Sequence, residues 1–405
     1  MNILLTIGML LIIGYLVGYL LERIGLPAII GYIGVGVLLS PNSFEFISEE
    51  IIEFTHPLLE ICLAFIAFEV GGSLKWSKLK EHGKTIIGIT LMASFVPFII
   101  TTAGILLTGL VLQDLLPFSS STLLILAVLA GVLASPTAPA GTVAVIHKYK
   151  AKGKVTDTLL GVVALDDVLG ILLFSLTLAV IFLFNGGQMG LFDSPILNAS
   201  YQIGISILTG AILGAIVNPV ARFFRINGEG QWVVILFALI IFCTGLSIAL
   251  QTDVLLSAMT MGMVVANFCK KQATLFAILE RYTEDLIFLF FFLLSGLQLD
   301  ITTLPQATVL ILLFVIFRTT GKYLGVHIGA HLTAADDSIK KYTAGGLLPQ
   351  AGIVIGLVLN IHQQDVFSNI SNLLLTTIMG TTIIFAIIGP LAAKYALKKA
   401  KEIKD

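Results

Sequence analysis

The chain has 405 residues, of which 57% are hydrophobic and only 12% are charged, and its mean hydropathy is +1.02. Soluble domains carry about 25% charged residues, so this composition excludes an ordinary soluble protein and indicates an integral membrane protein. The formal net charge of -1 excludes a strongly basic surface for nucleic acids. The three cysteines, Cys62, Cys243 and Cys269, lie in or beside apolar runs without CxxC spacing, which predicts packing residues rather than redox centres.

Apolar segments follow one another along the whole chain, and a helix needs about 20 apolar residues to cross a bilayer. The first segment has no basic region before it and no small-residue cleavage site, so we predict a retained helix rather than a signal peptide. We predict an all-α integral membrane fold with about thirteen spans. These spans are residues 3–21, 28–40, 51–71, 84–112, 122–146, 155–184, 201–224, 230–249, 253–268, 284–299, 305–332, 341–362 and 370–397.

The connecting loops predict how the chain is oriented. Loops after odd-numbered spans carry the lysines and arginines, whereas loops after even-numbered spans carry acidic residues such as Asp114, Asp193 and Asp253. Cytoplasmic loops are enriched in Lys and Arg. We therefore expect a multi-pass protein of the cell membrane, with its N-terminus outside, its C-terminus in the cytoplasm and an odd number of spans.

Two acidic and two basic residues inside predicted spans carry the argument for function. Asp166 and Asp167 are near the middle of span 155–184, and Arg318 and Lys322 are in span 305–332. A carboxylate at bilayer depth costs on the order of 3 kcal/mol, so such residues are normally paired and functional. Adjacent residues on a helix point about 100° apart. We therefore predict that one aspartate pairs with Lys322 and that the other faces a water-filled cavity; a purely structural salt-bridge network is the alternative.

Two spans are predicted to be interrupted, because they contain ASPTAPAG and GGLLPQAG. Proline removes a backbone donor and clashes with the preceding turn, and non-helical backbone at membrane depth must line a cavity or contact protein. The residues concerned are Ser135, Pro136 and Pro139 in the first motif and Pro349, Gln350 and Gly352 in the second. The first six spans and the last six have similar layouts. This predicts two inverted-topology repeats with crossed discontinuous helices and a site at the midplane.

The predicted site suggests ion exchange. A cavity-facing aspartate can hold a hard cation such as Na⁺ with oxygen ligands from Thr137, Ser135 and the unwound backbone. A proton and Na⁺ then compete for one carboxylate, and alternating exposure of that carboxylate gives antiport. If Lys322 also releases a proton when Na⁺ binds, transport is electrogenic. We expect no catalytic residue, and no cofactor beyond the transported Na⁺ and H⁺.

Three other polar groups have open interpretations. We consider three interpretations of Arg318: it pairs with Glu69 or Glu60, its side chain extends to the membrane interface, or it takes part in transport. Glu69 lies near the cytoplasmic end of its span and either lines an entry funnel or is an ordinary interfacial carboxylate. His327 and His331 are four residues apart, and we interpret them as solvated or capping groups rather than metal ligands.

The motifs together resemble a known family. They are ERIGLPAIIGYIGVGVLLSP, AFIAFEVGG, ASPTAPAG, VALDDVLG, LFLFFFLLSGLQLD and GLLPQAGIVIG, and they extend over nearly the whole chain. They resemble the monovalent cation/proton antiporters, in the branch that holds bacterial and archaeal sodium/proton antiporters and the membrane part of potassium-efflux antiporters. The paired aspartates with a distant intramembrane lysine are the most specific part of this resemblance.

The resemblance implies thirteen helices, a homodimer, and a core domain that moves like an elevator against a dimerisation scaffold. It implies scaffold helices in 1–83, core helices in 84–184, a linker and scaffold helices in 185–304, and core helices with a cytoplasmic tail in 305–405. It assigns ion binding to Asp167 and the salt bridge with Lys322 to Asp166.

The same resemblance bears on which cation is exchanged. Potassium-efflux relatives usually carry Gln-Asp at the positions of Asp166 and Asp167, so the Asp-Asp pair favours an electrogenic Na⁺ or Li⁺ exchanger. Many relatives carry an arginine and a glutamate in the twelfth span, where this chain has Gln350 and Gly352.

Other functions fit the sequence less well. A K⁺/H⁺ antiporter is the main alternative. An intramembrane aspartyl protease needs its two aspartates on separate helices, and here they are adjacent. A cation channel needs a repeated filter loop, and no stretch such as TVGYG is present. The expected partners are monovalent cations, protons and the lipid bilayer, with no nucleic acid.

Overall fold

A computed structural model describes residues 3–24, 26–40, 49–73, 83–113, 115–138, 142–143, 145–146, 149–185, 195–224, 228–298 and 304–403. Within these ranges the chain is helical and has no β-strand beyond one isolated pair of bridging residues. Eight of the described helices are long and apolar enough to cross a membrane. The predicted all-α membrane fold is therefore confirmed, whereas the number of spans and the repeats stay predictions.

The chain divides into two compact units, each built from two stretches of sequence. The first unit comprises Met1–Trp76 and Leu178–Ile301, and the second comprises Ser77–Thr177 and Thr302–Asp405. The helices of the first unit are α1 (Ile3–Arg23), α2 (Ala28–Leu39), α3 (Glu49–Ser73), α9 (Pro195–Phe223), α10 (Glu229–Ala249), α11 (Val254–Phe268), α12 (Gln272–Tyr282) and α13 (Glu284–Leu297).

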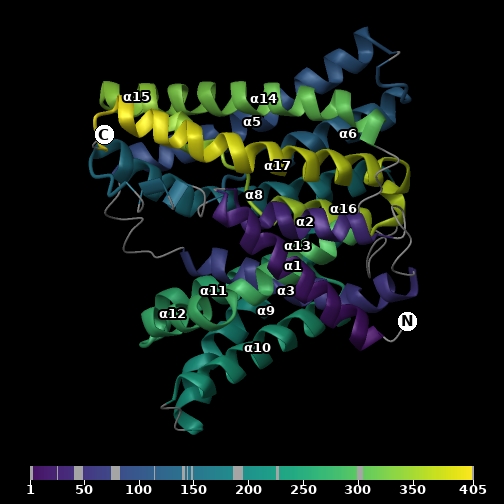
Figure 1. Ribbon diagram of the computed structural model, residues 1–405, viewed down its shortest axis with the longest axis vertical. Coiled ribbons are helices and arrows are strands. Elements are labelled where there is room, and N and C mark those ends of the chain that lie inside the picture. The colour runs from purple at the N-terminus through teal and green to yellow at the C-terminus, as the bar shows by residue number, and fades with distance from the viewer. Residues whose placement is uncertain are drawn as a thin grey trace. The chain divides into compact units, whose positions relative to one another are not determined.

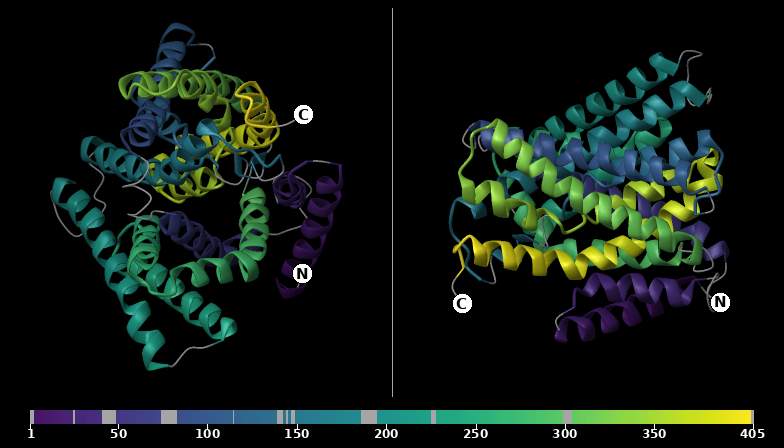
Figure 2. Two further views of the ribbon diagram at one scale, coloured as in Figure 1. Left: turned by 90° about the vertical axis from the view of Figure 1, so that its left-hand side faces the viewer. Right: turned by 90° about the horizontal axis from the view of Figure 1, so that it is seen from above.

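Close helix contacts shape the first unit. Helix α11 packs against α3 and α9, and α9, α10 and α11 lie side by side (Figure 2). A Cβ atom on Gly262 would collide with the carbonyl oxygen of Phe68, and one on Gly71 would collide with that of Met259. Small residues let helix backbones approach closely in membranes. These two glycines therefore permit the contact between α3 and α11.

The second unit contains both interrupted segments. Its helices are α5 (Gly83–Val111), α6 (Ser120–Leu133), α8 (Lys154–Asn185, which continues into the first unit), α14 (Leu304–Leu332), α15 (Asp337–Tyr342), the 3-10 helix η2 (Thr343–Leu347), α16 (Ile353–His362), the 3-10 helix η3 (Asp365–Phe367) and α17 (Ser368–Lys399). Helix α14 packs against α5 along much of its length and also contacts α17 (Figure 1).

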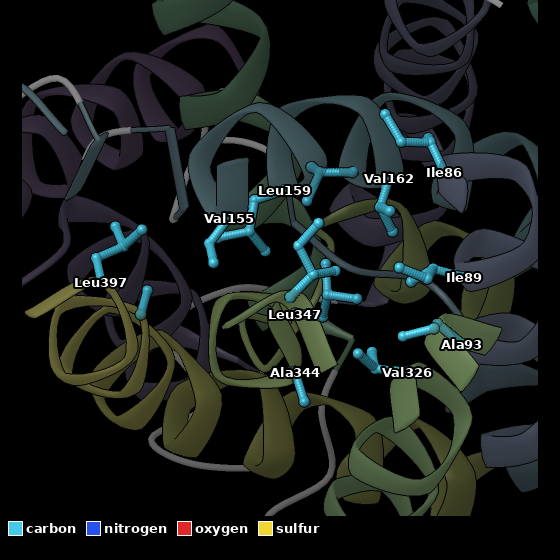
Figure 3. Packing of buried hydrophobic residues seen from close by; sticks show 14 of the residues in the cluster. Ile86, Ile89, Ala93, Val155, Leu159, Val162, Val326, Ala344, Leu347 and Leu397 are labelled. Atoms are coloured by element: carbon cyan, nitrogen blue, oxygen red, sulfur yellow. The ribbon is translucent and has the colours of Figure 1, made fainter. Parts of the chain in front are cut away.

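A buried apolar cluster holds the elements of this unit together. Ile89 of α5, Val162 of α8, Val326 of α14 and Leu347 of η2 are buried and converge in one cluster (Figure 3). Burying one such side chain contributes about 1.5–3 kcal/mol relative to exposing it. The cluster therefore fixes α8 relative to α5, α14 and the second interrupted segment.

The helix breaks lie where the proline motifs predict them. Helix α6 ends at Leu133, and residues 134–138 leave the helical path. Helix η2 ends at Leu347, and α16 begins after Gly352. Pro139, which we predicted as part of the first break, lies outside the described residues.

Candidate functional site

Asp166 forms a closed polar cluster with residues from two other helices. Lys322 Nζ of α14 lies 2.7 Å from Asp166 Oδ2, and Ser94 Oγ of α5 donates to Asp166 Oδ1 at 2.7 Å. All three side chains are fully buried. Hydrogen bonds to charged groups are the strong ones in a buried site, where the local dielectric is low. The predicted pairing of an aspartate with Lys322 is present, and it is Asp166 that makes the pair.

Asp167 is adjacent in sequence but has a different environment. Its side chain is 4% exposed, and its Oδ1 atom is buried without a hydrogen-bond partner. Gly170, one turn further along α8, contacts Pro136, because a Cβ at that position would lie 2.5 Å from Pro136 Cγ. Residues three and four apart on a helix share a face. The turn that carries both aspartates is therefore next to the break after α6.

The two interrupted segments meet through backbone hydrogen bonds. The Ala138 N–H donates to the Pro349 carbonyl at 2.9 Å, and Thr137 and Gln350 form an antiparallel bridge. The Thr137 hydroxyl also donates to the Leu347 carbonyl at 3.2 Å. These contacts join the two segments in antiparallel fashion and satisfy part of the backbone freed by the helix breaks.

We call the meeting point of the two interrupted segments, residues 134–138 and 348–352, the crossing. Arg318 of α14 contacts both segments there. Its Nη1 atom donates to the Leu348 carbonyl at 2.8 Å, and its Nη2 atom donates to the Pro136 carbonyl at 2.9 Å and to that of Pro349 at 3.4 Å. Its guanidinium lies 4.4 Å from the centre of the Phe385 ring. Carbonyls at a helix end carry partial negative charge, which a cation offsets. Arg318 thus binds the carbonyls of both broken segments at once.

This arrangement differs from one of our predictions for Arg318. The residue is fully buried, so it does not extend to the membrane interface. Its terminal nitrogens donate to backbone carbonyls instead of reaching a surface, because the two helix breaks leave those carbonyls without helical donors.

Several polar atoms near the breaks are buried without a partner. Besides Asp167 Oδ1, they include Ser135 Oγ and both amide atoms of Gln350. A buried polar group left unpaired costs about 1–3 kcal/mol. Groups of this kind in a native protein are bound by ordered water or an ion, or serve a functional role. Carboxylate, hydroxyl and carbonyl oxygens are the donor set that a hard cation prefers.

The structure brings together most of the predicted site residues, all in the second unit. They are Ser135, Pro136, Thr137, Asp166, Asp167, Arg318, Lys322, Pro349, Gln350 and Gly352. Glu69 belongs to α3 in the first unit and is half-buried. His327 and His331 are exposed on α14, and the His331 ring is 2.8 Å from the His327 carbonyl.

The sequence interpretation missed Ser94 and Thr142. The Thr142 hydroxyl donates to the Gly346 carbonyl at 2.6 Å and so adds a further contact between the interrupted segments. Within the described ranges no three His, Cys, Asp or Glu residues gather into a metal-binding group.

The chain is similar to known transporters along nearly its whole length. The family model "Sodium/hydrogen exchanger, transmembrane" matches residues 8–399. A Na⁺/H⁺ antiporter of Enterococcus hirae is 23% identical over 386 residues, which is 93% of this chain and 94% of that protein. The Na⁺/H⁺ antiporter NhaS4 of Synechocystis sp. is 26% identical over 420 residues, which is 97% of this chain and 96% of that protein.

A solved structure supports the fold. The sodium proton antiporter MjNhaP1 of Methanocaldococcus jannaschii matches with a TM-score of 0.75 and 18% identity, over 98% of each chain. At this identity the likeness concerns the fold and not the ion that is bound.

Proposed function

Because this chain belongs to the sodium/hydrogen exchanger family, whose model covers residues 8–399, we propose that it exchanges Na⁺ or Li⁺ for H⁺ by alternating access. Asp167 is the group for which cation and proton compete. The observation that carries this proposal is its unpaired, buried carboxylate oxygen, in a helical turn that lies next to the break after α6. A buried carboxylate needs a proton, a cation or a hydrogen bond to offset the cost of its charge.

The cation site draws on oxygens around the crossing. The Ser135 hydroxyl has no partner, and the Thr137 hydroxyl donates to the Leu347 carbonyl while keeping its lone pairs for a cation. With Asp167 and carbonyls of the broken segments, these groups supply only hard oxygen ligands. When the site is empty of cation, a proton on Asp167 removes the charge.

Asp166 and Lys322 couple cation binding at Asp167 to the release of a second proton. Asp166 is already bound by Lys322 and Ser94, so it does not need the transported cation. When Na⁺ binds at Asp167, the added positive charge disfavours the protonated form of Lys322. Release of two protons for one Na⁺ makes transport electrogenic, and each net charge contributes about 2.3 kcal/mol per 100 mV of membrane potential.

The two compact units suggest that one unit moves during transport and that the other serves as a scaffold. The unit of Ser77–Thr177 and Thr302–Asp405 carries the whole crossing and acts as the moving transport domain. The unit of Met1–Trp76 and Leu178–Ile301 acts as the scaffold through which two copies form a homodimer. The movement is of the elevator type, with the N-terminus outside the cell membrane and the C-terminus in the cytoplasm.

Proton release from acid-loaded proteoliposomes tests the proposal. We expect Na⁺ and Li⁺ to release protons from liposomes containing the parent protein, Asp167→Asn to abolish the release, and Lys322→Ala to impair it or change its charge coupling. Exposed Lys341→Ala serves as the matched control for the lost lysine. Release by K⁺ alone would indicate a K⁺/H⁺ antiporter, and undiminished release by Asp167→Asn would falsify the assignment of this residue.

A further inference from the structure

The helix that carries the two aspartates has no capping side chain on the residue directly before it. Helix α8 starts at Lys154, directly after Gly153, which has no side chain to accept a hydrogen bond. The first N–H groups of any helix lack partners within the helix. A Ser, Thr, Asp or Asn normally caps them. In this chain the cap comes from residue 402, near the other end of the sequence.

Glu402 satisfies the free donors at the start of α8. Its Oε1 atom accepts from the Val155 N–H at 2.8 Å, and its Oε2 atom accepts from the Thr156 N–H at 2.7 Å. The Thr156 hydroxyl also donates to Oε2 at 2.7 Å. A carboxylate in this place stabilises a helix through charge-assisted hydrogen bonds and through the partial positive charge of the helix N-terminus.

Gly153 fits this cap in two ways. Its φ angle is +155°, a conformation that residues with a side chain seldom adopt. A Cβ atom there would also collide with the carboxyl group of Glu402. The position before α8 therefore has room for a carboxylate that arrives from elsewhere in the chain.

The end of α17 directs Glu402 to this position. Lys401 has a left-handed conformation with φ of 61°, and the Glu402 N–H donates to the Leu397 carbonyl at 3.0 Å. This is the hydrogen-bond pattern that commonly ends a helix and reverses the chain. The Glu402 carbonyl accepts from the Lys152 N–H at 3.1 Å, and Ile403 packs against the buried cluster of the second unit. The tail is thus attached by backbone, side chain and apolar contacts.

We propose that Glu402 is a positioning residue for ion exchange: docking of residues 400–403 fixes the first turn of α8 and so fixes Asp167 relative to the crossing. Asp167 is thirteen residues after Lys154, which is about 20 Å along a rigid helix. Loss of the cap frees the two N–H donors of Val155 and Thr156 and loosens the first turn of α8. This inference rests on the proposed exchange function only for its kinetic readout.

The test compares Glu402→Ala and Glu402→Gln with a matched control, Asp157→Asn. Asp157 is an exposed acid in the first turn of α8, so its replacement removes the same charge without removing the cap. In Glu402→Ala we expect amide hydrogens of residues 153–160 to exchange about fivefold faster, equivalent to about 1 kcal/mol. Glu402→Gln keeps one acceptor oxygen and is expected to lie between the parent and Glu402→Ala.

The kinetic measurement separates positioning from simple stabilisation. In proteoliposomes we expect the apparent KM for Na⁺ to rise about threefold or more in Glu402→Ala, with a smaller change in maximal rate. Unchanged amide exchange in 153–160, an unchanged KM despite faster amide exchange, or an equal effect of Asp157→Asn would each overturn the proposal. A parent protein that exchanges no cation for protons would contradict the proposed function, while amide exchange would still decide whether Glu402 caps α8.

Discussion

Asp166 and Asp167 show how neighbouring residues on one helix acquire different roles. Asp166 is bound by Lys322 and Ser94, whereas one oxygen of Asp167 has no partner. Part of this division follows from the sequence, because adjacent helical residues point about 100° apart and intramembrane cations are scarce. Ser94 could not be predicted, since a serine in an apolar helix more often donates its single proton to a carbonyl of its own preceding turn, and the Thr90 carbonyl lies 2.9 Å from Ser94 Oγ.

Arg318 marks the limit of residue-level prediction at this site. The sequence shows a buried cation and suggests a carboxylate partner or an extension to the interface. In the structure its partners are backbone carbonyls of Pro136, Leu348 and Pro349. Every residue has a carbonyl, so no side-chain pattern identifies which ones the folded chain leaves unpaired.

Replacement of Arg318 is expected to destabilise the crossing. In Arg318→Ala the carbonyls of Pro136 and Leu348 lose their donor, at a cost of about 1–3 kcal/mol for each buried group. We expect a lower thermal unfolding midpoint in detergent, together with loss of Na⁺/H⁺ exchange. Arg222→Ala, at an exposed position near the end of α9, is the control and should match the parent. A parent-like midpoint for Arg318→Ala would show that these hydrogen bonds contribute little.

At the scale of the helix, the length of the apolar runs predicted the long helices, and the positions of the prolines predicted the helix breaks. The helices that hold the aspartates and the lysine, Lys154–Asn185 and Leu304–Leu332, agree with the predicted spans within one residue at each end. The two breaks also lie at their proline motifs. The connecting helices α12 and α15 were not predicted, because they are short and their sequences carry no span-length apolar run.

Glycine positions determine which helices can approach each other, and α14 illustrates this. A Cβ atom on Gly325 would collide with the Met92 carbonyl oxygen of α5, and one on Gly321 would lie 2.5 Å from Pro97 Cα. The sequence shows glycines at both positions but not their neighbours, so the pairing of α14 with α5 was not predictable from spacing alone.

Adding one methyl group at this contact is expected to separate α5 from α14. We expect Gly325→Ala to cost about 1–3 kcal/mol through overpacking and to lower the unfolding midpoint. Gly245→Ala in α10 is the opposite case, because nothing lies within 4 Å of the place that its new methyl group would occupy and alanine favours helix. Its midpoint should be equal or higher. Equal midpoints for Gly325→Ala and the parent would mean that the two helices separate at no cost.

At the scale of the whole molecule, composition alone identified the protein class, but not how distant segments combine. Each compact unit joins two stretches separated by about a hundred residues or more, as with Ser77–Thr177 and Thr302–Asp405. The ion pair between Asp166 and Lys322 and the cap by Glu402 both join such stretches. The first was predictable because buried charges require partners. The second was not, because Glu402 looks like one more charged residue in a polar tail.

The orientation of the molecule in the membrane is open to a direct test, since it follows from the loop charges. In a variant whose cysteines Cys62, Cys243 and Cys269 are replaced by alanine, we expect Gln113→Cys to react with an impermeant thiol reagent on intact cells. Lys270→Cys should react only after the cells are permeabilised. Both positions are exposed and lie outside the helices, so access across the bilayer decides their labelling.

The expected labelling follows from the orientation of the protein, which depends on the free energy of moving charged loops across the membrane. Lysine and arginine near span ends are retained on the cytoplasmic side, and Lys270 and Lys271 follow α11 while Gln113 follows α5 in a loop with no basic residue. Because the positions lie after an odd-numbered and an even-numbered predicted span, one missed span between them would place both on the same side. Labelling of both from outside would therefore contradict the span count, and reversed labelling would contradict the orientation while preserving the count.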